Sequence, residues 1–206
     1  MKRAVVFVDG QNLYRSAKEA FGYHYPNYDI AKLAKLICQK QGWNLVGTCF
    51  YTGIPDQTDD SFWHDFWSRK MAVMGSRGIH VYSRKLRYRN QTIKLPDGST
   101  HTILVGQEKG IDIRLALDVV QAVLKNQCDV AVVLSQDQDL SEVADEIRNI
   151  AQETGRWIKI ACAYPFSPTS KNPRGIHRTD WIKIDRTTYD QCIDPIDYRK
   201  PITGKQ

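Results

Sequence analysis

The sequence predicts a three-layer α/β/α fold with a mostly parallel sheet and an inserted β-hairpin. Two apolar runs, 3–8 and 129–134, are typical of strands covered on both faces of a sheet. Stretches with helical spacing of apolar residues alternate with short apolar runs along most of the chain. This alternation indicates parallel strands joined by helices that cover both faces of the sheet.

The individual elements follow this rhythm. Helices are expected where apolar residues recur every three or four positions, at 11–21, 30–41, 59–75, 109–125 and 139–154. Short apolar runs predict further strands at 44–51, 79–82, 157–163 and 181–184. Residues 84–105 break the rhythm, and their Pro96-Asp97-Gly98 turn predicts a hairpin. We expect one domain over 1–186, with this insertion, and a partly disordered tail over 187–206.

Composition narrows the class of protein. Hydrophobic residues make up 42% of the 206 residues and charged residues 25%, as in soluble globular domains. No apolar run approaches the roughly 20 residues that span a bilayer, so we expect a cytoplasmic protein without a membrane partner. The five cysteines form no C-x-x-C pair, which argues against a zinc site or a disulfide framework. A net charge of +6 favours polyanionic partners.

Acidic residues follow both strongly predicted strands directly. Asp9 ends the first run, and Asn12 lies one turn into the next helix. Ser135, Asp137 and Asp139 follow the run at 129–134. In open α/β sheets, ligands bind beyond the carboxyl ends of the strands. If these two strands are neighbours, their aspartates converge.

A third acidic stretch opens the helix expected at 109–125. It contains Asp112, and Glu108 lies on the same side if the helix begins that early. Asp118 is about 240° around the helix from Asp112, so both cannot easily reach one ion. Singly, such acids are often helix caps or solvated residues, and Asp139 fits a cap equally well. Asp9 is harder to explain in this way alone, because a carboxylate directly after a buried strand is desolvated unless it has a partner.

A cluster of these acids would require a cation. Two carboxylates about 5 Å apart repel by roughly 3 kcal/mol at an effective dielectric near 20. The three acidic stretches contain neither histidine nor cysteine. Oxygen ligands alone select Mg²⁺ or Mn²⁺ over zinc.

Three stretches in this order, VFVDGQNL, KGIDIRLALD and LSQDQDL, resemble the motifs of the NYN domain family of PIN-like nucleases. The resemblance covers about 4–163, and TDWIKI extends it to 184 by resembling the closing strand. It implies a PIN-like sheet in the order 3-2-1-4-5 and a metal-dependent endoribonuclease. One departure is Gln136, where the family usually has glycine, and we expect it to narrow the pocket or alter the turn.

The resemblance also implies a set of site residues. It places Asn12 beside an acidic pocket of catalytic, metal-binding aspartates, namely Asp9, Asp112, Asp137 and Asp139. We expect one or two Mg²⁺ or Mn²⁺ ions there, which would activate a water and stabilise charge on the attacked phosphate. Asn12 and Ser135 would hydrogen-bond the phosphate or an outer-shell water, and Lys109 would pair with a phosphate oxygen.

The start of the expected hairpin carries a basic stripe. On an extended strand Lys85, Arg87 and Arg89 share one face, and Leu86 and Tyr88 share the other. Such a stripe suits a nucleic-acid backbone, although a charged edge also protects a sheet from aggregation. Trp63 and Trp67 could line the mouth of the site, but an aromatic stripe at their spacing favours core packing. We expect single-stranded RNA as the partner and allow for a homodimer.

Other functions on this fold are weighed against the nuclease. A non-catalytic RNA-binding or regulatory module would keep the fold without turnover, and Gln136 is its best support. A phosphatase of the haloacid dehalogenase type needs D-x-D after its first strand, where this chain has Asp9-Gly10-Gln11. A nucleotide-binding dehydrogenase needs G-x-G-x-x-G after a strand, and no such motif is present.

Overall fold

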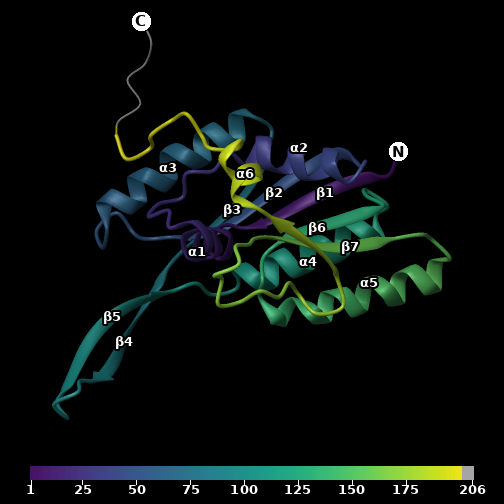
Figure 1. The fold of residues 1–206 in the computed structure, drawn as a ribbon. Helices are drawn as coiled ribbons and strands as arrows, with labels where there is room; N and C mark the ends of the chain where they lie inside the picture. Colours follow the sequence, from purple (N-terminus) through teal and green to yellow (C-terminus); the bar gives the residue numbers. More distant parts are fainter. Residues whose placement is uncertain (201–206) are drawn as a thin grey trace, which may run out of the picture.

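A six-stranded parallel sheet forms the centre of the computed structural model, which describes residues 1–200 (Figure 1). The strand order β3-β2-β1-β6-β7-β8 confirms the predicted order of five strands, with the predicted closing strand at the edge. The hairpin strands β4 and β5 lie outside this sheet. The parallel strands are β1 (Arg3–Asp9), β2 (Asn44–Ile54), β3 (His80–Lys85), β6 (Val130–Leu134), β7 (Lys159–Pro165) and β8 (Asp180–Ile184).

Helices cover both faces of the sheet, which gives the predicted three layers (Figure 1). One face packs against α1 (Gly10–Phe21), α2 (Ile30–Lys40), α3 (Ser61–Ser76) and α6 (Arg186–Asp190). The other face packs against α4 (Ile111–Leu124) and α5 (Ser141–Thr154). Successive side chains of β1 enter the two cores in turn, because neighbouring residues of a strand point to opposite faces. Within residues 1–200 no helix has the length and apolar character needed to cross a bilayer.

Two helix starts next to the predicted acidic site differ from the prediction. The helix expected from residue 109 begins at Ile111, because Gly110 has φ +73°, a left-handed conformation that favours glycine. Glu108 therefore lies in the connection after β5 instead of on the helix. The helix expected from Asp139 is preceded by a 3₁₀ turn, η1 (Gln138–Leu140), which Asp137 caps by accepting the backbone N–H of Asp139 at 3.0 Å.

The predicted hairpin projects from the body of the molecule (Figure 1). It consists of β4 (Arg87–Lys94) paired with β5 (Thr100–Gln107), and Gly98 in its turn has φ +84°. Its start lies slightly later than expected, because Lys85 still belongs to β3. The expected alternation holds around this junction, since Leu86 and Tyr88 are half-buried whereas Arg87 is exposed.

Residues 187–200, expected to be partly disordered, pack on the α2–α3 face. Tyr189, Cys192 and Tyr198 are buried there. The Lys70 amine donates to the carbonyl of Tyr28 at 2.7 Å and lies 3.5 Å from the Asp194 carboxylate. Burying these apolar groups offsets the entropy lost on ordering the segment. The rest of the expected tail, 201–206, lies outside the described residues.

Candidate active site

The register of the central strands brings Asp9 and Ser135 together. Val8 of β1 pairs with Leu134 of β6, so the residues that follow them meet at the carboxyl edge of the sheet. The Ser135 hydroxyl donates to one carboxylate oxygen of Asp9 at 3.1 Å. The other oxygen accepts the backbone N–H of Asn12 at 2.9 Å and caps α1. Asp9 is only 4% exposed, and these bonds fix its orientation.

Carboxylates from four segments line one cleft of about 510 Å³ at this edge. We call it the acidic cleft; its carboxylates are Asp9, Glu108, Asp112 and Asp137. They reach it from the ends of β1 and β5, the first turn of α4 and the connection after β6. These stretches lie far apart in the sequence and meet only in the folded chain.

Burial and mutual repulsion disfavour the charged forms of the acids in this cleft. Burial raises the pKa of Asp9 to about 6, and the charge of Asp112 adds to the shift. Burial likewise raises the pKa of Glu108 to about 7 and that of Asp112, where Asp137 and Asp139 contribute by repulsion. Such mutual shifts are typical of functional sites.

Glycine at position 53 allows Glu108 to reach the acidic cleft. Glu108 accepts a hydrogen bond from the backbone N–H of Gly53. A Cβ at this position would lie 2.6 Å from the Glu108 side chain and 2.5 Å from Leu86, so a larger residue would displace these side chains. The sequence contains no pattern that predicts the contact between Gly53 and Glu108. Only the position of Glu108, four residues before Asp112, indicated that it could belong to the site.

Two cations border the acidic cleft. Lys109, predicted from the sequence, and Arg15, which was not, both line it. The positive charge of Arg15 acts against the rise in the pKa of Glu108 and Asp112. A signal for Arg15 was present, because it lies one helical turn after Asn12, which itself follows Asp9 by three positions.

Not every predicted acid lines the cleft. Asp139 is exposed, and only its charge reaches Asp112. Asp118 lies apart, as expected: its carboxylate forms an ion pair with Arg114 at 2.9 Å and accepts the Tyr51 hydroxyl at 2.9 Å. Ser135 is buried, and its hydroxyl also accepts the backbone N–H of Asp137 at 3.1 Å.

The donor set suits a hard divalent cation, although the ligands are not gathered tightly. Within residues 1–200, no three side chains of histidine, cysteine, aspartate or glutamate form a group that could hold a metal ion. However, Mg²⁺ usually keeps several waters and binds proteins through only one or two carboxylates. The acidic cleft offers such carboxylates, and its raised pKa values indicate that a cation would relieve repulsion.

Gln136 does not line the acidic cleft. Its side chain accepts the Ser16 hydroxyl at 2.7 Å and donates to the carbonyls of Asn172 and Arg174 at 3.0 and 2.8 Å. Its backbone N–H donates to the Asn12 side-chain oxygen at 2.8 Å. The amide thus connects the end of β6 to the connection between β7 and β8, a role that the sequence did not reveal.

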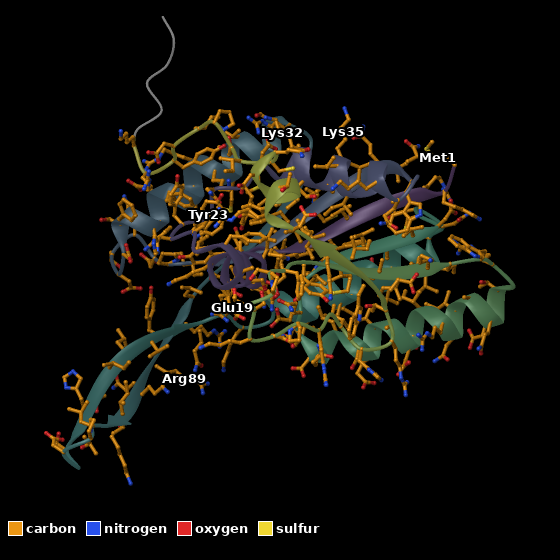
Figure 2. The ribbon with its side chains drawn as sticks, viewed as in Figure 1. Met1, Glu19, Tyr23, Lys32, Lys35 and Arg89 are labelled. Carbon is orange, nitrogen blue, oxygen red and sulfur yellow. The ribbon has the colours of Figure 1, made fainter. Side chains whose placement is uncertain are left out.

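The predicted basic residues lie beside the acidic cleft and on the hairpin. Arg87 and Arg89 are exposed on β4, and Figure 2 shows Arg89 on the projecting hairpin. Lys85, at the end of β3, forms an ion pair with Asp56. Leu86, Val105 and Gly106, at the base of the hairpin, line the acidic cleft, so the basic strand begins at its rim.

A family model described as the NYN domain matches residues 3–169. The chain belongs to the NYN domain family. NYN domains are PIN-like nucleases that generally use divalent metals and act on nucleic acids. No curated protein matches the chain.

One solved structure shares the fold of this NYN domain. A protein of unknown function from Vibrio parahaemolyticus RIMD 2210633, VPA0982, is 18% identical, with a TM-score of 0.55. The match covers 90% of this chain and 94% of that one. A deacetylase–teicoplanin complex from teicoplanin biosynthesis is 17% identical over 76% of this chain and 68% of that one, but its TM-score is only 0.33.

Proposed function

We propose that this NYN domain is a metal-dependent endoribonuclease that hydrolyses single-stranded RNA. The observation that carries the proposal is the acidic cleft, in which carboxylates from four separate segments converge beside two cations. Helix capping explains one acid at one helix, but it does not explain acids from a strand end, two connections and a helix gathered in one cavity.

Each residue has a role in this proposal. A Mg²⁺ or Mn²⁺ ion held by Asp9, Asp112 and Asp137 with waters would activate a water and stabilise charge on the attacked phosphate. Arg15 and Lys109 line the same cleft and would pair with phosphate oxygens. Asp139 adds negative charge from the rim, and the pairs Asn12–Gln136 and Ser135–Asp9 hold the acids in place.

RNA would approach along the hairpin. Arg87 and Arg89 are exposed on β4, whose base borders the acidic cleft, and Lys85 lies next to them at the end of β3. Cations that follow a strand suit phosphates spaced along a backbone.

Replacing Asp137 with asparagine tests the nuclease proposal. Asparagine retains the oxygen that accepts the Asp139 N–H but lacks the negative charge. We expect Mn²⁺-dependent cleavage of a single-stranded RNA to fall on the order of 100-fold or more, because even outer-shell metal-site changes typically cost 10- to 100-fold. EDTA should abolish the cleavage by the wild type.

Asp118→Asn is the matched control, since Asp118 lies outside the acidic cleft. It should cut RNA at the wild-type rate. Wild-type cleavage by a well-folded Asp137→Asn protein would refute the assignment.

A non-catalytic RNA-binding module is the second candidate. The observation that favours it is the lack of a preformed three-carboxylate group within residues 1–200. This candidate predicts salt-dependent RNA binding by the wild type without cleavage in either Mg²⁺ or Mn²⁺. The cleavage assay with the wild-type protein therefore separates the two.

A further inference from the structure

A second cleft, of about 410 Å³, adjoins the acidic cleft. Gln11, Leu86 and Gly106 line both cavities and form their common wall. A ligand in the acidic cleft thus lies next to the second cavity, separated from it by the start of α1 and the base of the hairpin.

Aromatic side chains from three elements line this second cleft, which we call the aromatic cleft. They are Tyr14 of α1, Trp63 and Trp67 of α3, and Tyr88 of β4. Trp67 is buried against Phe50, whereas the other three are half-buried and keep part of their surface accessible. Core packing thus accounts for Trp67, whereas Tyr14 and Trp63 pack against the core with only part of their surface.

Contacts with Phe66 and Asp60 fix the position of Trp63. The two rings meet edge to face, with centroids 5.1 Å apart, and Phe66 itself is fully buried. The Trp63 backbone N–H donates to the Asp60 carboxylate at 3.1 Å, which caps α3. Trp63 is therefore a fixed aromatic surface, and stacking on it would cost little side-chain entropy.

We propose that the aromatic cleft binds one nucleobase of the RNA, next to the phosphate that is cut. This inference rests on the proposed function. Stacking on aromatic side chains is the usual way in which proteins hold the bases of single-stranded RNA. With the phosphate in the acidic cleft, the neighbouring base would reach over Gln11 and Leu86, which form the shared wall, into the aromatic cleft.

The polar groups of the aromatic cleft favour a base over a phosphate. Asp60 lines it, and a carboxylate repels phosphate but accepts N–H groups from the edge of a base. Gln11 adds an amide that can both donate and accept.

The geometry also defines the substrate class. A base enters such a cavity only when it is unpaired and free to leave its neighbours, so duplex RNA is excluded. The scissile phosphate should therefore be flanked by an unpaired base, and an RNA lacking that base should bind less tightly.

Abasic RNA tests the inference without changing the protein. We would measure binding of fluorescein-labelled single-stranded dodecamers by anisotropy in EDTA, moving a single abasic residue along the strand. For the cleavage readout, the same RNAs are mapped in Mn²⁺. An abasic residue beside the cut should weaken binding about 5- to 100-fold, the range for loss of one base–aromatic stack, and should suppress that cut.

Protein variants provide the second measurement. Tyr88→Ala and Trp63→Leu should weaken binding of the intact dodecamer in EDTA and reduce its dependence on the base beside the cut. Tyr88→Phe keeps the ring and should bind like the wild type. Trp157→Leu is the matched control for Trp63→Leu. Trp157 is half-exposed, lies before the amino end of β7 and lines neither cleft, since both clefts lie at the carboxyl ends of the strands.

The outcomes separate this inference from the nuclease proposal. If the protein cuts RNA but ignores the abasic residue at every position, the aromatic cleft holds no base and the nuclease proposal stands. If it cuts nothing in Mn²⁺ but loses affinity with the abasic residue and in Tyr88→Ala, the base site stands and the nuclease proposal fails.

Discussion

At the scale of single residues, Asp9 combines structural and chemical demands. It ends the central strand, caps α1 through the N–H of Asn12 and accepts the Ser135 hydroxyl. These two hydrogen bonds favour its charged form, but burial and Asp112 disfavour it more, and its pKa rises to about 6. The free protein therefore carries a buried charge that costs stability near neutral pH.

We expect Asp9→Asn to be more stable than the wild type in EDTA at pH 7. The folded-state pKa of Asp9, about 6, lies above its ordinary value of 3.8, so ionisation at pH 7 favours the unfolded chain. Asparagine keeps an oxygen for the Asn12 N–H, and the expected gain is about 1–3 kcal/mol. Urea unfolding measures it.

Divalent metal should reverse this order of stability and make the wild type more stable than Asp9→Asn. Millimolar Mn²⁺ should raise the free energy of unfolding of the wild type and leave Asp9→Asn unchanged, because a ligand that binds the folded state stabilises it by mass action. Asp118→Asn is the control and should respond to Mn²⁺ like the wild type. A less stable Asp9→Asn protein in EDTA would contradict this account of the buried charge.

At the scale of elements, the hairpin stands apart from the core. No side chain of β4 or β5 is buried, so its sequence is free to serve binding. Its base nevertheless shapes both clefts, because Leu86 and Gly106 line each of them. The element thus connects the exposed cations to the acidic cleft.

Reversing the charges of Arg87 and Arg89 should weaken RNA binding by about tenfold or more at low salt, since repulsion replaces attraction at two phosphates. The slope of log affinity against log salt should become shallower by about 0.7 for each phosphate that the variant no longer neutralises. The fold should persist, because both side chains are exposed. Filter binding over a salt series in EDTA measures both quantities.

Lys32→Glu/Lys35→Glu is the matched control. It makes the same change in net charge on exposed residues of α2, on the side of the molecule away from Arg89 (Figure 2). Equal reductions of affinity in the two double variants would mean that overall charge, and not the hairpin, governs binding.

At the scale of the whole molecule, both cores bury thiols. Burial raises the pKa of Cys38, Cys128 and Cys192 to about 11 and that of Cys162 to about 12, from about 9. These folded-state values exceed the unfolded ones, so the stability they provide is complete below about pH 9 and is lost as pH rises towards 11–12. Lys70 acts in the opposite direction, because burial lowers its pKa to about 8.

The thiols outnumber this lysine, so the free energy of unfolding should fall by several kcal/mol between pH 8.5 and 10.5. Urea unfolding with a reductant measures the decrease. The Cys38→Ala/Cys128→Ala variant should be less stable at pH 8.5, because two buried groups are removed, but its stability should fall less on going to pH 10.5. An equal decrease in both proteins would assign the alkaline instability to other groups.

The strand order was implied by the resemblance to the NYN family. The sequence by itself determined the layers and the acids at the carboxyl ends of β1 and β6. These features depend on local patterns. A buried strand is an apolar run in the sequence, and the carboxyl ends of parallel strands all lie on the same side of the sheet. The positions of Asp9, Asp112 and Asp137 followed from such patterns and the family motifs.

Only the tertiary structure decided which side chains share a cavity. Gly110 turns the chain so that Glu108 enters from a connection. Gln136 bonds to a distant loop, and Asp139 is exposed and does not line the acidic cleft. The aromatic cleft exists because the hairpin base folds against α1 and α3. Contacts between segments distant in the chain depend on loop conformations and packing, which leave no periodic signal in the sequence.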